Sequence, residues 1–457
     1  MKEKSKKGKG WLLILLTAVV MVTVAGVLVV RMEGEAPQVE LTLGTTAFGL
    51  TKEVKITVAD GKSGLQKIWA GIIKDGREVE LLKKTYASSG ILRKGKVSRD
   101  SFDFSVKPKE LGLTDGSGML RLVVTDYSWR GWGKGNRTYI EKPISIDTQA
   151  PRIDVLTHAH NISPGGSALV VYKLSEPCET SGVAVGEHFY PGYAAGETEK
   201  DLYIAFFALA QDQAKGTPIS LEATDPAGNQ SRAGFYHYIK KKNFRKDVIR
   251  ISDGFLDAKL PEFEPLLAGQ TGKEPIEKFL YVNREIRKQN KIVIDKITAS
   301  SDRQVHWKGT FIRLPGSASR AQFADRRSYL YKGKTIDHQV HLGQDLASHS
   351  MAPVPAGNSG KIVFNEYLGI YGNTIIIDHG YGLFSLYGHL SSSNVRKGQM
   401  VTKGDIIGHT GKSGMAGGDH LHFSMLVHNT FVTPLEWWDA DWIRNNVTDK
   451  LTEFAKN

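Results

Sequence analysis

Five side chains that can bind a metal ion or transfer a proton lie within one stretch of the sequence, positions 335–423. They are His341, Asp345, His389, His420 and His422. Imidazole nitrogen and carboxylate oxygen are ligands that zinc accepts, and a catalytic zinc site keeps three protein ligands so that water can take the fourth position. The stretch therefore predicts the site of a zinc hydrolase.

Two local patterns would direct these side chains toward a common point. Side chains alternate between the faces of a strand, so His420 and His422 point to one face and Leu421 to the other. One of the two histidines can then hold the metal while the other faces substrate. Gly343, between His341 and Asp345, permits a tight turn, which favours a loop over a helix at this position.

The order of these motifs resembles the lysostaphin-type (LytM-like) zinc metalloendopeptidases, which cut peptide bonds in peptidoglycan. The motifs are His341-x-x-x-Asp345, Gly388-His389-Leu390, and His420-x-His422 followed by Phe423. The resemblance runs from about Phe311 to Trp438 and includes the framing stretches Pro353–Ala356, Ile376–Gly380, Val395–Gly398 and Lys403–Gly408. It implies one zinc ion per chain, held by His341, Asp345 and His422, with His389 and His420 as catalytic residues that do not bind the metal.

The residue types also indicate a mechanism. Zinc lowers the pKa of bound water from about 15.7 toward roughly 7 and polarises a carbonyl as a Lewis acid. A histidine, with an ordinary pKa near roughly 6.5, can take a proton from the attacking water and pass it to the leaving amine, or can hydrogen-bond the developing oxyanion. Because the sequence contains no His-Glu-x-x-His string, a glutamate base of the thermolysin kind is not expected.

Composition is that of a folded, multidomain protein. With 457 residues, 40% hydrophobic and 24% charged, the chain is long enough for about three domains. The formal charge is +12, and the part of the chain after residue 30 has 55 basic and 47 acidic residues, a mild excess of +8 that favours an anionic cell wall or lipid surface. No nucleic-acid-binding motif is present, and nucleic acid is not an expected partner. The single cysteine, Cys178, cannot form an intramolecular disulfide and is expected to be a buried thiol rather than a zinc ligand.

The N-terminus has the pattern of a membrane anchor. Five lysines precede an uncharged apolar run, Trp11–Val30. Twenty helical residues span about 30 Å, the thickness of the hydrocarbon core of a bilayer. The lysines should stay in the cytoplasm, which places the chain after Arg31 outside the cytoplasmic membrane. The alternative is a cleaved signal peptide, but the run ends in Val-Leu-Val-Val, which is a poor cleavage site.

Two segments after the anchor alternate apolar and polar residues between Gly-rich turns. Val54, Ile56 and Val58 show the pattern, and it restarts with Ile153 and Val155 after a joint at residues 147–151. The second segment ends with Thr224-Asp225 and Asn229, which echo Thr125-Asp126 and Asn136 in the first. The pair resembles tandem bacterial immunoglobulin-like modules. Their turn aspartates are expected to cap backbone amides, with a calcium site as the alternative. The modules would form a stalk or a binding arm.

A helix and a β-rich region follow. Pro275 opens a helical pattern that continues to about Asn290, and this helix either packs on the fold or lies over the active-site cleft as an inhibitory or positioning element. A hairpin of residues 374–389 should deliver His389, and Val401 should pair with Ile406–Ile407. Trp437 and Trp438 are expected in the core, before an amphipathic helix that closes the chain.

These patterns define one overall expectation. The fold is mainly β, with an N-terminal transmembrane helix, two immunoglobulin-like β-sandwiches, a helical linker and a C-terminal β-rich lysostaphin-type (duplicated hybrid motif) peptidase domain. The boundaries are 1–10 for a cytoplasmic basic tail, 11–30 for the anchor, 39–149 and 150–240 for the modules, 241–310 for the linker, 311–438 for the zinc peptidase domain and 439–457 for the final helix.

The expected protein is a single-pass membrane endopeptidase that cleaves peptidoglycan peptides in the periplasm or outside the cell. The alternatives are a catalytically silent activator of other cell-wall hydrolases and a zinc peptidase that acts on a protein. A regulatory protein partner is possible and unidentified from the sequence.

Overall fold

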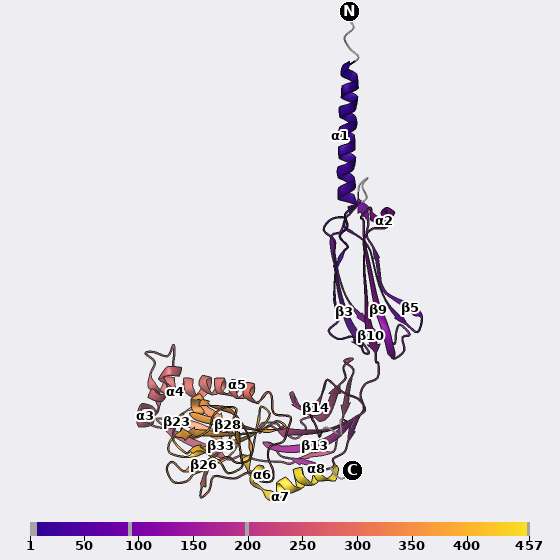
Figure 1. The fold of residues 1–457 in the computed structure, drawn as a ribbon. Helices are drawn as coiled ribbons and strands as arrows, with labels where there is room; N and C mark the ends of the chain where they lie inside the picture. Colours follow the sequence, from indigo (N-terminus) through magenta and orange to yellow (C-terminus); the bar gives the residue numbers. More distant parts are fainter. Residues whose placement is uncertain (1–6, 90–93, 197–200, 455–457) are drawn as a thin grey trace, which may run out of the picture. The chain divides into compact units, whose positions relative to one another are not determined.

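The computed structural model describes residues 7–89, 94–196 and 201–454 (Figure 1). Its internal contacts divide the chain into two compact units, with the boundary in the sequence between Ala150 and Pro151. The first unit also includes Thr224–Gln230, and the second contains all the rest of the chain after Ala150. Most of the predicted basic tail, residues 1–10, lies outside the described residues.

The first unit begins with the long helix α1 (Lys7–Arg31). Its segment Gly10–Arg31 has 22 residues and a mean hydropathy of 2.9, and none of its most apolar window is buried by the protein. At its end, Arg31 donates a hydrogen bond of 3.1 Å to the carbonyl oxygen of Tyr127 and lies 5.5 Å from the ring of Trp129. The helix is thus joined to the β-structure by side-chain contacts.

Two sheets follow α1 in the first unit and enclose one core. One sheet contains β1 (Gln38–Thr42), β3 (Lys52–Ala59) and β8 (Arg99–Val106). The other contains β2 (Ala47–Phe48), β10 (Arg137–Ile146), β9 (Gly116–Asp126), β4 (Leu65–Lys74) and β5 (Arg77–Thr85). Val54, Ile56 and Val58 point into the core, as their alternation predicts. Asp126 accepts hydrogen bonds from the backbone nitrogens of Ser128 and Asn136, so it caps a turn.

The second unit starts with another pair of small sheets. One contains β11 (Ile153–Val155), β13 (Gly166–Leu174), β17 (Leu202–Leu209) and β16 (Tyr193–Ala194). The other contains β15 (His188–Pro191), β14 (Thr180–Val185), β18 (Ile219–Thr224) and β19 (Gln230–Ala233). Cys178 is half-buried beside these sheets, so the expectation of a buried thiol is wrong. It lies in the irregular segment before β14 and packs partly against the core.

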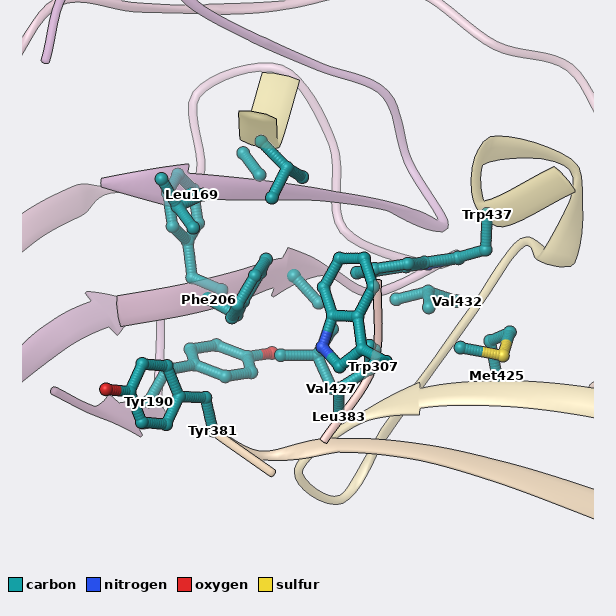
Figure 2. Close-up of a cluster of buried hydrophobic side chains, with 14 of the residues drawn as sticks. Leu169, Tyr190, Phe206, Trp307, Tyr381, Leu383, Met425, Val427, Val432 and Trp437 are labelled. Carbon is teal, nitrogen blue, oxygen red and sulfur yellow. The ribbon is translucent and has the colours of Figure 1, made fainter. Parts of the chain in front are cut away.

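This second β module shares a hydrophobic core with the C-terminal domain (Figure 2). The ring of Phe206 lies 6.0 Å from Trp437 and 6.2 Å from Trp307. The hydroxyl of Tyr190 lies 2.8 Å from that of Thr430. Since large aromatic side chains carry much of the burial energy of a core, the module and the domain stabilise each other.

A helical segment connects the module to the C-terminal domain. Strand β21 (Lys246–Ile251) leads into α3 (Asp253–Phe263), and a helix then runs through α4 (Pro275–Tyr281), the π-helical turn η2 (Val282–Ile286) and α5 (Arg287–Thr298). Pro275 occupies the first turn as predicted, and Glu274 and Glu277 form a capping box. The helix extends eight residues past Asn290 because Ile294 and Thr298 continue its buried face.

The C-terminal domain is built on one large sheet. Across it lie β22 (Ala318–Ala321), β25 (Gln344–Ala347), β33 (Leu421–Val427), β29 (Leu383–Leu390), β28 (Asn373–Gly380), β27 (Gly360–Tyr367) and β31 (Met400–Val401), and β34 (Thr430–Val432) pairs with β33. The hairpin β28–β29 matches the predicted one.

Two smaller sheets complete the domain. They are β26 (Pro353–Pro355), β32 (Ile406–His409) and β30 (Ser392–Ser393), and β21, β23 (Arg326–Tyr331) and β24 (Lys334–Val340). The expected pairing of Val401 with Ile406–Ile407 is wrong: Val401 pairs with Gly360, and the second segment pairs with β26 and β30. Strands this short have too few residues for periodicity to identify their partners.

The chain ends in short helices. They are α6 (Pro434–Trp438), α7 (Ala440–Ile443), the π-helical turn η4 (Arg444–Thr448) and α8 (Asp449–Phe454). Trp437 is fully buried, as expected for a core residue, whereas Trp438 is partly buried and stacks on Phe423 with the ring centroids 5.3 Å apart. Residues 455–457 of the predicted final helix lie outside the described residues.

Candidate metal centre

The turn between β24 and β25 brings His341 and Asp345 to one point. His341 directly follows β24, and Asp345 lies in β25, paired in register with His422 of β33. A Cβ atom on Gly343 would lie 2.4 Å from Nε2 of His422 and 2.6 Å from Oγ of Ser424. Glycine is therefore required at position 343 by the close approach of the His422 ring.

The ligand atoms of His341, Asp345 and His422 converge on a buried point. Nε2 of His341 lies 3.0 Å from Oδ1 of Asp345 and 3.1 Å from Nδ1 of His422, and this Nδ1 lies 2.9 Å from the same Oδ1. Ligands about 2.0–2.1 Å from a tetrahedral zinc ion are about 3.3 Å from one another. Two nitrogens and one oxygen at this spacing, all inside the protein, fit a zinc ion.

Hydrogen bonds fix the tautomer of both ligand histidines. Nδ1 of His341 donates to the carbonyl oxygen of Gln322 at 2.9 Å, which leaves Nε2 unprotonated toward the metal position. The Ser424 hydroxyl donates to the carbonyl oxygen of Leu342 at 2.7 Å, so it must accept from Nε2–H of His422, 3.0 Å away. Nδ1 of His422 is then the free acceptor. Such outer contacts orient the ligands of metal sites.

Asp345 is held as a carboxylate. Burial by itself raises its pKa, but His341, His420 and His422 outweigh burial and hold the pKa of Asp345 well below its usual range. Its second oxygen, Oδ2, accepts a hydrogen bond of 3.1 Å from Arg327 of β23. An anionic oxygen ligand is therefore maintained at the metal position.

His389 and His420 lie beside the three ligands. Their rings are 4.8 Å apart, and Nε2 of His420 lies 3.6 Å from Oδ1 of Asp345. Each donates from Nδ1 to a carbonyl oxygen, His389 to Ser413 and His420 to Gly418, both at 2.8 Å, so each keeps Nε2 for other partners. Burial, with the nearby His420 and His422, holds the pKa of His389 well below its usual range. His389 is thus a neutral imidazole.

The backbone of His389 is strained. Its φ is 62°, a conformation that residues other than glycine adopt rarely. It is maintained by strand pairing on both sides, since Gly388 pairs with His422 and Leu390 with Asn373. Strained residues of this kind cluster at functional sites, where the surrounding structure overdetermines them.

All five predicted residues line one cavity of about 310 Å³. The sequence did not point to Arg327, Tyr371 or Ser424, which also contact the ligands. The ring of Tyr371 lies 5.3 Å from that of His422. Only Ser424 has a sequence signal, because it lies two positions after His422 in β33, and the alternation of the strand places both side chains on one face.

Two other histidines of the domain lie away from the ligands. His379 is fully buried, with Nδ1 donating to the carbonyl oxygen of Ser359 and Nε2 beside the Ser385 hydroxyl. Burial lowers the pKa of His379 to about 4. His409 contacts the Ser392 hydroxyl in the small sheet.

The large sheet thus carries a buried group of two histidines and one aspartate that could hold one metal ion. Residues 339–434 match the model of Peptidase family M23. This part of the chain is therefore an M23 peptidase domain of the LytM/lysostaphin type, as the sequence resemblance predicts.

Curated relatives match over segments of similar length. The DD-carboxypeptidase/endopeptidase Mpg of Neisseria meningitidis is 36% identical over 97 residues, 21% of this chain and 22% of that protein. The peptidoglycan DD-endopeptidase ShyB of Vibrio cholerae is 34% identical over 119 residues, 26% of each chain. The matched region thus spans about a quarter or less of the length of these relatives.

Solved structures give similar matches. A putative peptidase M23 from Pseudomonas aeruginosa is 21% identical, with a TM-score of 0.39, over 61% of this chain and 95% of that one. The catalytic domain of lysostaphin from Staphylococcus simulans is 30% identical, with a TM-score of 0.25, over 28% of this chain and 96% of that one.

Proposed function

We propose that this protein is a zinc-dependent endopeptidase that hydrolyses peptide bonds in the stems or cross-links of peptidoglycan, outside the cytoplasmic membrane. The observation that carries the proposal is the convergence of His341, Asp345 and His422 with two further histidines in one cavity. A buried cluster of two imidazoles and one carboxylate has little reason to exist without a cation, because two unprotonated nitrogens 3.1 Å apart do not bond each other.

His341, Asp345 and His422 would hold the zinc ion. Bound there, zinc would supply Lewis-acid polarisation and lower the pKa of water, the chemistry that peptide hydrolysis requires. Ser424, Arg327 and the carbonyl oxygen of Gln322 would keep the three ligands in place.

His420 and His389 would manage the protons. In both, Nδ1 is occupied by a carbonyl oxygen, so Nε2 is the atom that would accept a proton from water and return it to the leaving amine. Either Nε2 could instead, when protonated, donate to the oxygen of the substrate carbonyl as it becomes negative.

The names of the relatives support the substrate. Mpg is called a DD-carboxypeptidase/endopeptidase and ShyB a peptidoglycan DD-endopeptidase. Retention of the complete ligand set favours an enzyme over a silent activator, since loss of metal ligands is the simplest route to inactivity.

The N-terminal part would hold the enzyme at the membrane. α1 is long enough and apolar enough to span a bilayer. We propose that it is an uncleaved anchor and that the immunoglobulin-like modules act as a stalk. Sequencing of the mature N-terminus checks the anchor, because retention of Trp11 supports it and a terminus near Glu33 contradicts it.

Digestion of isolated peptidoglycan, followed by mass spectrometry of the released fragments, tests the function. We expect new peptide ends that disappear with a chelator and return with zinc, and no digestion of unstructured protein. Digestion of the protein in preference to peptidoglycan would indicate the protein-directed peptidase. Release of fragments only when another hydrolase is added would indicate the activator.

A further inference from the structure

One wall of the catalytic cavity comes from outside the segment that matches the peptidase family. Strand β21 and the helical segment, all before residue 300, contribute Arg250, Ile251, Phe255, Phe279 and Arg287 to its lining. The family match begins at residue 339. A substrate in this cavity therefore contacts both the peptidase domain and the helical segment. The helical segment can recognise a different part of the substrate from the part that the peptidase domain binds.

Arg287 of this wall is held in a fixed position. Its Nε donates to the carbonyl oxygen of Asn283 at 3.1 Å, and its Nη2 donates to Oδ1 of the same residue at 2.7 Å. The amide nitrogen of Asn283 donates to Asp337 of β24 at 2.8 Å, which sets the direction of the amide. Asn283 lies in the π-helical turn η2, a feature often found at functional sites. The remaining guanidinium donors of Arg287 stay available to a ligand.

The cavity has an excess of positive charge. Three arginines line it, and Asp345 is the one carboxylate among its described lining residues. Arg327 is paired with Asp345. In the described part of the chain, neither Arg250 nor Arg287 has a carboxylate within ion-pair distance. Two arginines thus line the cavity without a protein carboxylate in ion-pair contact with them.

We propose that Arg250 and Arg287 bind a carboxylate of the substrate next to the scissile bond, so that the enzyme selects anionic peptides. This inference rests on the proposed function. A guanidinium group matches a carboxylate with two parallel hydrogen bonds, which makes arginine selective for this group. Phe255 and Phe279 form an apolar background, and the interaction of opposite charges is stronger where water is excluded.

The test uses the full chain and two short peptides that contain the same cleavable bond. One peptide has a free side-chain carboxylate next to that bond, and the other has the corresponding carboxamide. A charge-assisted hydrogen-bond pair predicts a kcat/KM about 10–100-fold higher for the carboxylate peptide. In Arg287→Gln and Arg250→Gln, the preference should fall to less than about threefold, mainly through a higher KM for the carboxylate peptide.

Lys288→Gln is the matched control. Lys288 is an exposed cation next to Arg287 that does not line the cavity, and its variant should keep the full preference. The zinc content and the thermal midpoint show whether each variant is folded. Arg250 is exposed and lacks the contacts that Arg287 makes with Asn283, so Arg250→Gln is the variant with less effect on the fold.

A native enzyme that cleaves both peptides equally would overturn the inference and leave the proposed function intact. Arginine variants that cleave both peptides faster, with the preference for the carboxylate peptide unchanged, would also overturn the inference. They would indicate that the helical segment covers the cavity and inhibits cleavage. Failure of the native enzyme to cleave either peptide would contradict the proposed function itself.

Discussion

Arg327 donates a hydrogen bond of 3.1 Å to Oδ2 of Asp345, while the other oxygen of that carboxylate contacts His341 and His422. Arg327 lies in β23, so the metal position depends on a strand outside the large sheet. The two oxygens of Asp345 therefore make different contacts: Oδ1 lies beside the other two ligand residues, and Oδ2 binds Arg327 of β23.

Arg327→Gln should weaken zinc binding by about 10–100-fold, because outer partners of metal ligands typically contribute that much. A competition titration with a chromophoric chelator measures the affinity. Arg326→Gln is the control, since the neighbouring Arg326 lies over Phe244 and contacts Gln211 instead of the ligands. Equal zinc affinities of the two variants would refute the role given to Arg327.

Ser424→Ala should reduce zinc affinity to a similar extent. Without the hydroxyl, nothing fixes the proton on Nε2 of His422, and the tautomer with a protonated Nδ1 cannot bind the metal. The same titration applies. Ser385→Ala provides a matched control, because Ser385 is equally buried in the adjacent strand β29 but contacts His379. An unaltered affinity in Ser424→Ala would show that the tautomer is set in another way.

Glu436→Gln should change how stability depends on pH. The Glu436 carboxylate accepts hydrogen bonds from the backbone and hydroxyl of Ser167, and burial raises its pKa from 4.5 to about 7, although Lys240 and Lys242 oppose the rise. A raised carboxyl pKa stabilises the folded state fully below about pH 4.5, and this contribution is lost as the pH rises through about 7.

The contribution of Glu436 to the free energy of unfolding that is lost in this way amounts to up to about 3 kcal/mol. The thermal midpoint of Glu436→Gln, relative to the native protein, should therefore rise between pH 5 and pH 8 by several degrees. Scanning calorimetry at the two pH values measures the difference. Glu453→Gln, which changes an exposed carboxylate in α8, should show no such change. A constant difference between Glu436→Gln and the native protein would argue against a protonated Glu436.

Phe206→Ala should destabilise the second β module and the peptidase domain together. The Phe206 ring contacts Trp307 and Trp437 (Figure 2), and removal of a buried phenylalanine ring costs about 3–5 kcal/mol. Denaturant unfolding followed by tryptophan fluorescence should show one transition at lower denaturant. Phe189→Ala, at a position 42% exposed, should have an effect below about 0.5–1 kcal/mol. Separate transitions for the module and the domain would contradict the shared core.

The sequence predicted the centre of the site better than its surroundings. His341, Asp345, His389, His420 and His422 lie in short motifs, and all five line one cavity. His420 directly precedes β33, which contains His422. Arg327 and Arg287 reach the site through tertiary packing, which no local pattern encodes. The shared core has the same origin, since Phe206 and Trp437 are 231 positions apart in the chain.

Short elements also limited the prediction of the fold. The alternation of Val54, Ile56 and Val58 identified a strand because one face is buried along its length. Strands of two to four residues, such as β31 and β32, have no such signal, and their partners were assigned wrongly. The helix after Pro275 continues past its expected end because its last turns also bury one face. The buried residues of these turns lie between charged ones in the sequence, so the helical pattern is less visible there.

The zinc content of purified protein tests the central claim most directly. The native chain and His420→Ala should each retain about one zinc ion, whereas His341→Ala and His422→Ala should retain almost none, since loss of one of three protein ligands leaves too few to hold the ion. Peptidoglycan cleavage should be lost in all three variants. A full complement of zinc in His341→Ala and His422→Ala, or unimpaired cleavage by zinc-free protein, would contradict the account.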